Sequence, residues 1–178
     1  MVLGNTLYQL KKYIIDNYGQ AFFTDLIKDL DPEIKKILSN AVLSDKFYDV
    51  RAKVELVTAF RAVKSEEEAA KMTIAECDSQ INWLYSLLLK AINLKQLVSM
   101  GNIFWKKNFT TGSQTGELSN DGKKIHMTIT TGYKVTPAYT KHLEVYEGRM
   151  FEMVGNCKFK SNSRMINDTD IELSYEME

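Results

Sequence analysis

The side chains best suited to acid–base, nucleophilic or metal chemistry are two histidines, His126 and His142, and two cysteines, Cys77 and Cys157. Neither histidine has an acid or a cysteine at a spacing typical of a catalytic dyad. The two cysteines lie far apart in the sequence and fit no metal-binding spacing. The sequence therefore predicts no catalytic residue and no metal site, and we do not expect an enzyme.

The surroundings of these four groups favour structural roles. His126 falls among the polar positions of an alternating segment, which indicates a surface histidine. Cys77 lies between Glu76 and Asp78, and two neighbouring acids raise the pKa of a thiol rather than activate it. Cys157 is expected on the covered side of a sheet, where a thiol acts as a small apolar group. Both cysteines are expected to stay reduced in a cytoplasmic compartment.

A second set of residues could line an interface or a ligand pocket. A helix is predicted over Thr136–Val154, and Gly148 interrupts it at a cost of roughly 1 kcal/mol relative to alanine. A glycine there indicates close approach of another backbone, within the fold or across a dimer, or room for a ligand. Other candidates are His142 beside the apolar stripe of this helix and a group of large side chains: Tyr139, Tyr146, Met150 and Trp105. The alternative for these large side chains is an ordinary place in the core.

The order of the elements predicts an α+β fold, in which an N-terminal helical bundle is followed by a ββαββ antiparallel sheet unit. Residues 1–64 should form the helical region, and residues 65–178 the central helices with the ββαββ unit. The two parts are expected to pack as one compact domain. The segment Ile81–Phe109 is apolar nearly all round, which predicts a central buried helix. Helix starts are indicated at Asp31-Pro32 and at Ser65.

Two hairpins are predicted on either side of the last helix. Their turns are indicated by Asn120-Asp121-Gly122 and by Asn167-Asp168. The alternation of apolar residues in the closing hairpin predicts that Phe159 lies near Tyr175, and that Lys158 lies near Glu176 on the opposite face.

Composition excludes several classes of partner. The chain of 178 residues carries 23 basic and 23 acidic side chains, so the net charge that favours nucleic acid or an anionic membrane is missing. The longest apolar run, Leu87–Leu89, is far shorter than a membrane span. The first ten residues lack the pattern of a signal peptide. A cytoplasmic protein without a membrane span is expected.

The C-terminal pattern resembles a known superfamily. The matching segments are the hairpin Gly116–Thr130, the helix Pro137–Val154 with Glu147-Gly148 inside it, and the closing hairpin Asn156–Tyr175. They are similar to the superfamily that joins haem nitric-oxide-binding domains, vinyl-reductase-type small-ligand domains and Golgi transport tethering subunits. The whole chain resembles an uncharacterised family abundant in myxobacteria, through Val2-Leu3-Gly4, Ser44–Tyr48 and Phe104-Trp105.

The sequence departs from the cofactor-binding members of this superfamily. The haem-binding relatives supply a proximal histidine from a long helix and a Tyr-x-Ser-x-Arg motif for the propionates. Here Ser65–Phe109 contains no histidine, and neither Tyr139-Thr140-Lys141 nor Tyr133-Lys134-Val135 reproduces the motif. The cysteine-rich metal site of the vinyl-reductase-type domains is also missing. The resemblance therefore implies a module without haem, zinc or another inherited cofactor.

Two functions are consistent with these observations. The first is a non-enzymatic regulatory or protein-interaction module in bacterial signalling, with a protein partner or a homodimer. The alternative is a sensor or carrier of a small apolar ligand, held without haem in a pocket between the central helix and the sheet.

Overall fold

The computed structural model describes residues 1–81 and 91–178. Its helices are α1 (Gly4–Leu26), α2 (Pro32–Ser39), α3 (Arg51–Val63), α4 (Glu66–Gln80), α6 (Leu94–Asn108) and α7 (Pro137–Gly155). Its strands are β1 (Val2–Leu3), β2 (Phe47–Tyr48), β3 (Ser113–Leu118), β4 (Lys124–Thr130), β5 (Phe159–Met165) and β6 (Asp170–Met177). The predicted α+β class, with helices first and the sheet later, is confirmed.

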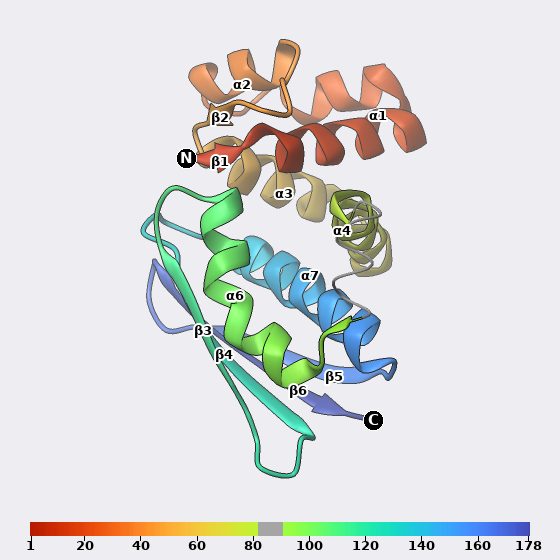
Figure 1. Cartoon of the computed structure of the whole chain (residues 1–178). Helices are drawn as coiled ribbons and strands as arrows, with labels where there is room; N and C mark the ends of the chain where they lie inside the picture. The colour runs from red at the N-terminus through yellow and green to blue at the C-terminus, as the bar shows by residue number, and fades with distance from the viewer. Residues whose placement is uncertain (82–90) are drawn as a thin grey trace.

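The elements form successive layers (Figure 1). Helices α1 and α2 lie at one end with the short pair β1–β2, and α3 lies beneath them. The four-stranded sheet lies at the other end, and α6 and α7 pass between it and the N-terminal helices. One face of the sheet is buried, because β4 and β6 turn Ile125, Met127, Ile129, Ile171, Leu173 and Tyr175 toward the helices. The core is thus shared by both parts of the chain.

Local signals set most helix starts where the sequence indicates them. The Asp31 carboxylate accepts hydrogen bonds from the backbone N–H groups of Glu33 and Ile34, with Pro32 at the first helical position. Ser65 and Glu68 form a reciprocal capping box at the start of α4. Each cap satisfies backbone donors that a helix start leaves open.

The expected continuous helix over Ile81–Phe109 is wrong. Ile81 already ends α4, residues 82–90 lie outside the described residues, and α6 begins only at Leu94. Asn93 caps α6 by accepting from the Gln96 N–H, a local bond that competes with helix continuation. The described half of the expected helix, α6, lies over the sheet.

The sheet has the strand order β3-β4-β6-β5, with every neighbouring pair antiparallel. Both predicted hairpins are present, and they join through the pairing of β4 with β6. The buried Glu144 fastens α7 to the edge strand β5, because its carboxylate accepts from the hydroxyls of Ser161 and Ser163 at 2.5 Å each.

The expected register of the closing hairpin is wrong by two residues. Phe159 pairs with Met177, and Lys160 rather than Lys158 pairs with Glu176. The Asn167 side chain accepts from the N–H groups of Thr169 and Asp170 at 2.8 Å each, so it opens the turn instead of centring it. A shift of two keeps every side chain on its face, and Phe159 and Tyr175 both pack against Phe151.

The register can be tested by cross-linking in a Cys157→Ser background. We expect Asn162→Cys with Ser174→Cys to form a disulfide on mild oxidation, because directly paired Cα atoms lie within bonding range. The control pair Asn162→Cys with Glu172→Cys, which the other register would join, should stay reduced. Thiol titration and peptide mapping would give the opposite pattern if the closing hairpin had the register expected from its alternation.

Candidate functional site: a pocket between α6, α7 and the sheet

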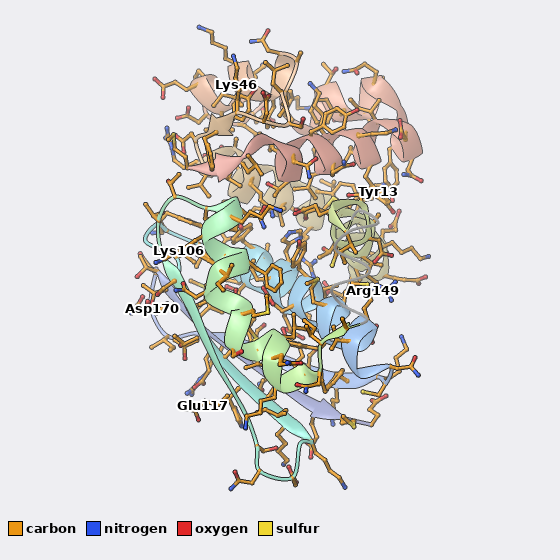
Figure 2. All side chains as sticks on the ribbon, in the orientation of Figure 1. Tyr13, Lys46, Lys106, Glu117, Arg149 and Asp170 are labelled. Carbon is orange, nitrogen blue, oxygen red and sulfur yellow. The ribbon has the colours of Figure 1, made fainter. Side chains whose placement is uncertain are left out.

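A pocket of about 120 Å³ lies where α3, α6 and α7 meet the sheet and the start of α1. Side chains fill much of the remaining space between α6 and α7 (Figure 2). The pocket wall is largely apolar and aromatic, and it includes Leu97, Val98, Phe104 and Trp105 of α6, Leu143, Tyr146, Met150 and Phe151 of α7, and Met127 of β4. Such a wall favours an apolar ligand.

Two glycines bring α6 close to β3 and so shape this wall. A Cβ atom on Gly101 would lie 3.0 Å from the Gln114 side-chain nitrogen, and one on Gly116 would lie 2.9 Å from a methyl group of Val98. Without these Cβ atoms the helix rests directly on the strand, and Gln114 lies beneath it with 4% exposure. Gly101 therefore lies within α6 as a packing residue.

The structure brings three of the predicted site residues together at the pocket, namely Trp105, Tyr146 and Met150. Tyr139 and His142 lie outside its lining, fully buried and stacked on each other with ring centres 5.7 Å apart. Gly148 faces the sheet, where a Cβ atom would lie 3.2 Å from the Tyr175 ring. A contact inside the chain therefore accounts for the missing side chain at Gly148.

Glu147 supplies an acid to the apolar pocket. It lines the pocket together with Gln114, whose side chain is its hydrogen-bond partner. Desolvation raises the pKa of Glu147 to about 7, although the hydrogen bond from Gln114 and the charge of Lys53 act in the opposite direction. The carboxyl group can therefore gain or lose its proton near neutral pH.

A buried ion pair closes one side of the pocket. The Lys53 ammonium of α3 donates to the Glu76 carboxylate of α4 at 2.7 Å, and the two side chains are 3% and 0% exposed. Lys53 also lies over the rings of Phe109 and Tyr146, at 5.6 and 5.7 Å from their centres. Desolvation by itself would raise the pKa of Glu76, but Lys53 and His142 outweigh it and lower that pKa to about 2.

His142 connects this pair to α7. Its Nε2 atom lies 3.0 Å from the second Glu76 oxygen, at an angle poor for a hydrogen bond, and its Nδ1 atom lies 2.9 Å from the Thr73 hydroxyl. Burial lowers the pKa of His142, so the ring is neutral at pH 7. Because Glu76 is ionised, the ring proton belongs on Nε2. Nδ1 then competes with the Ala69 carbonyl oxygen, 3.0 Å from the Thr73 hydroxyl, for the single proton of that hydroxyl.

Sequence reasoning missed Lys53, Glu76 and Glu147 as site residues. A usable signal existed for the first, because Lys53 falls three residues after Val50 and four before Val57, on the apolar side of its helix. Glu76 follows Met72 at the same helical spacing. Nothing in the sequence, however, pairs a lysine on one helix with an acid on the next.

No protein-family model matches this sequence, and no curated protein matches it either. Solved structures are similar to it throughout. The Fe(II) unliganded H-NOX protein from K. algicida has a TM-score of 0.70 at 14% identity, covering 100% of this chain and 97% of that one. A mutant of Cs H-NOX has a TM-score of 0.70 at 11% identity, with 100% and 97% covered. A mutant of T. tengcongensis H-NOX has a TM-score of 0.65 at 10% identity, with 95% and 93% covered.

The similar structures place this chain in a class that is defined by its fold. The chain shares the fold of these H-NOX structures, as the resemblance in its sequence predicts. Within the described residues, no helix is long and apolar enough to cross a bilayer.

The pocket residues do not fit a haem, the group that this fold implies. The pocket volume of about 120 Å³ is well below the roughly 300–1,000 Å³ of pockets that hold drug-sized ligands and cofactors. The sequence has two histidines, and neither can serve as an axial ligand in the pocket. His126 is exposed on the outer face of β4, while both ring nitrogens of His142 face Thr73 and Glu76.

The buried ion pair predicts an asymmetric response to mutation. Lys53→Met should lower the free energy of unfolding by about 3–5 kcal/mol, because it leaves Glu76 buried without its cation. The double variant Lys53→Met/Glu76→Gln should recover much of this loss, since no uncompensated charge remains. Urea unfolding at pH 7 measures both values, and a single variant as stable as wild type would show that the pair is not buried in solution.

Gly148 gives a second stability test. We expect Gly148→Leu to destabilise the chain by about 1–3 kcal/mol, because the Tyr175 ring cannot move aside. That ring packs on Phe151, and its hydroxyl donates to the Glu144 carbonyl at 2.8 Å. Val145→Leu, on a partly exposed side of α7, is the matched control. A fully stable Gly148→Leu variant that has lost self-association would instead place this glycine at an interface between copies.

Proposed function

We propose that this protein is a non-catalytic regulatory module of a signalling system, which responds to a small, mainly apolar ligand bound without haem between α6, α7 and the sheet. The pocket supports this proposal most directly. It combines apolar and aromatic walls with a few converging polar groups, the usual composition of a small-molecule site. The H-NOX fold supports it further, since solved relatives are described through their haem and its ligand state.

The size of the pocket indicates the size of the ligand. An apolar cavity of about 150 Å³ in another protein binds benzene, so a pocket of about 120 Å³ suits a molecule of about that size or smaller. The ligand proposed here is therefore much smaller than a porphyrin. It would enter a site that the fold already forms, which limits the ordering needed for binding.

The position of the pocket allows binding to be transmitted. Its wall includes Asn5 and Thr6 of α1, Lys53 of α3 and Met127 of the sheet, so one ligand would contact both ends of the molecule. A ligand shifts a conformational equilibrium only as far as its contacts differ between the states. We propose that a protein partner, or a second copy of the chain in a homodimer, reads this change in the cytoplasm.

The closer relation to the myxobacterial-type family is also part of the proposal. Two features that carry the resemblance have structural reasons here. A Cβ atom on Gly4 would lie 2.0 Å from the Leu43 carbonyl oxygen, and Trp105 donates its indole N–H to the Thr111 carbonyl at 2.8 Å before the first long strand. Related chains would need the same residues for the same packing.

Ligand binding can be tested with benzene as the probe. Buffer saturated with benzene should raise the melting temperature of the wild type by a degree or more, because a ligand that binds only the folded state stabilises it. Met150→Trp, which fills the pocket, should abolish the shift. Met153→Trp, on the same helix but outside the pocket lining, should retain it.

Two results would count against the proposed function. A wild type without any shift would show that the pocket admits no such ligand. An equal shift in the Met150→Trp variant would place the binding elsewhere on the molecule.

A further inference from the structure

Among the described residues that line the pocket, Glu147 is the only acid. It lies among aromatic side chains of α6 and α7, including Phe104, Trp105 and Phe151. Its hydrogen-bond partner is the neutral amide of Gln114. Among the residues that the structure describes, no basic side chain forms an ion pair with Glu147. Within the described part of the chain, an ionised carboxylate at this half-buried place therefore gains little compensation for the water that it loses.

Two lysines line the pocket, Lys53 and Lys107, and neither is free to meet a ligand anion. Lys53 donates to Glu76 at 2.7 Å, and that pair is electrically balanced. A ligand anion would have to draw Lys53 away from Glu76 and would meet the Glu147 carboxylate as well. A pure hydrocarbon would fill the apolar space but leave the carboxylate dry. The ligand must therefore give the Glu147 carboxylate a partner and also fill the apolar space. A ligand with one positive charge and an apolar body does both.

We propose that the pocket binds a small amine, whose apolar body fills the space beside α6 and whose protonated nitrogen meets the Glu147 carboxylate. This inference rests on the proposed function and names its ligand class. The aromatic lining adds to the selectivity, because the faces of Trp and Phe rings attract a cation held within about 6 Å. Gln114 would orient the carboxylate through its amide.

The pH dependence of binding follows from the groups around Glu147. Burial holds the pKa values of Tyr146 on α7, Cys77 on α4 and Tyr175 on β6 well above their ordinary values, so these groups stay neutral near pH 7. Lys53 remains paired with Glu76, and Lys107 lines the same pocket as a further lysine. An alkyl ammonium, with a pKa near that of lysine at about 10, stays charged. Glu147 is therefore the group whose ionisation sets the affinity for an amine.

The test compares three probes of matched size, n-butylamine, 1-butanol and n-pentane. Binding is followed through the NMR signals of the methionine methyl groups, since Met127 and Met150 line the pocket. We expect n-butylamine to bind at least about tenfold more tightly than 1-butanol at pH 8, as a hydrogen bond between charged groups provides. Its affinity should rise roughly tenfold between about pH 6 and pH 8, as Glu147 ionises.

Glu147→Gln is the deciding variant, because it keeps the shape and the hydrogen-bonding capacity of the side chain. We expect it to reduce the affinity for n-butylamine at least about tenfold and to remove the pH dependence, while n-pentane binds unchanged. Equal affinity of wild type and Glu147→Gln for the amine would overturn the proposal. If all three probes fail to bind, the proposed function itself fails. If n-pentane binds and the amine does not exceed it, only the ligand class is wrong.

Glu147→Gln should also fold, which keeps the experiment interpretable. The raised pKa means that the folded state holds a proton on Glu147 that the unfolded state releases between about pH 4.5 and pH 7. The free energy of unfolding of the wild type therefore falls as the pH rises through this range, because the folded state must then bury the Glu147 charge. The variant should be at least as stable as wild type at pH 8, and thermal melting checks this. The Gln114→Glu variant cannot replace Glu147→Gln in this test, because a second acid beside Glu147 would weaken the packing.

Discussion

The buried pair of Lys53 and Glu76 is the interaction on which the rest of the structure depends. It joins α3, from the N-terminal helices, to α4, and through His142 it reaches α7. Each charge has lost its water, so each relies on the other for compensation. The pair also determines the chemistry nearby, because it commits the Lys53 ammonium in the pocket wall to an acid outside the lining. Burial keeps the neighbouring histidine neutral. Because Lys53 is already paired with Glu76, the pocket disfavours an anionic ligand.

Helix α7 is held by contacts on several of its sides. One side presents His142 and Tyr146 to α4, and Tyr146 lines the pocket there with Met150. Another side holds Glu144 against two serines of β5. Gly148 lets the Tyr175 ring come close beneath the helix. These contacts determine which side chains of α7 face the pocket.

The same fold can therefore support different sites. H-NOX structures with TM-scores of 0.70 share the path of this chain at 11–14% identity, and yet the residues inside this one do not fit a porphyrin. Fold is set by the pattern of apolar positions and turns, which many sequences satisfy, whereas a site is set by a few side chains. Here these are an ion pair, an acid in an apolar wall and two histidines placed away from the pocket.

The sequence by itself determined the features that depend on neighbours along the chain. The caps at Asp31 and Ser65, the two hairpin turns and the ββαββ order were all readable, because a cap or a turn is made within a few residues. Local signals were less reliable where two of them competed. Asn93 ended the expected central helix, and Asn167 displaced the closing register by two residues. Tertiary structure alone decided the site, since Lys53 meets Glu76 across 23 residues of chain and Thr73 meets His142 across 69. Whether a charged side chain is buried, paired or left facing a pocket depends on which helices pack together, and no local pattern encodes that choice.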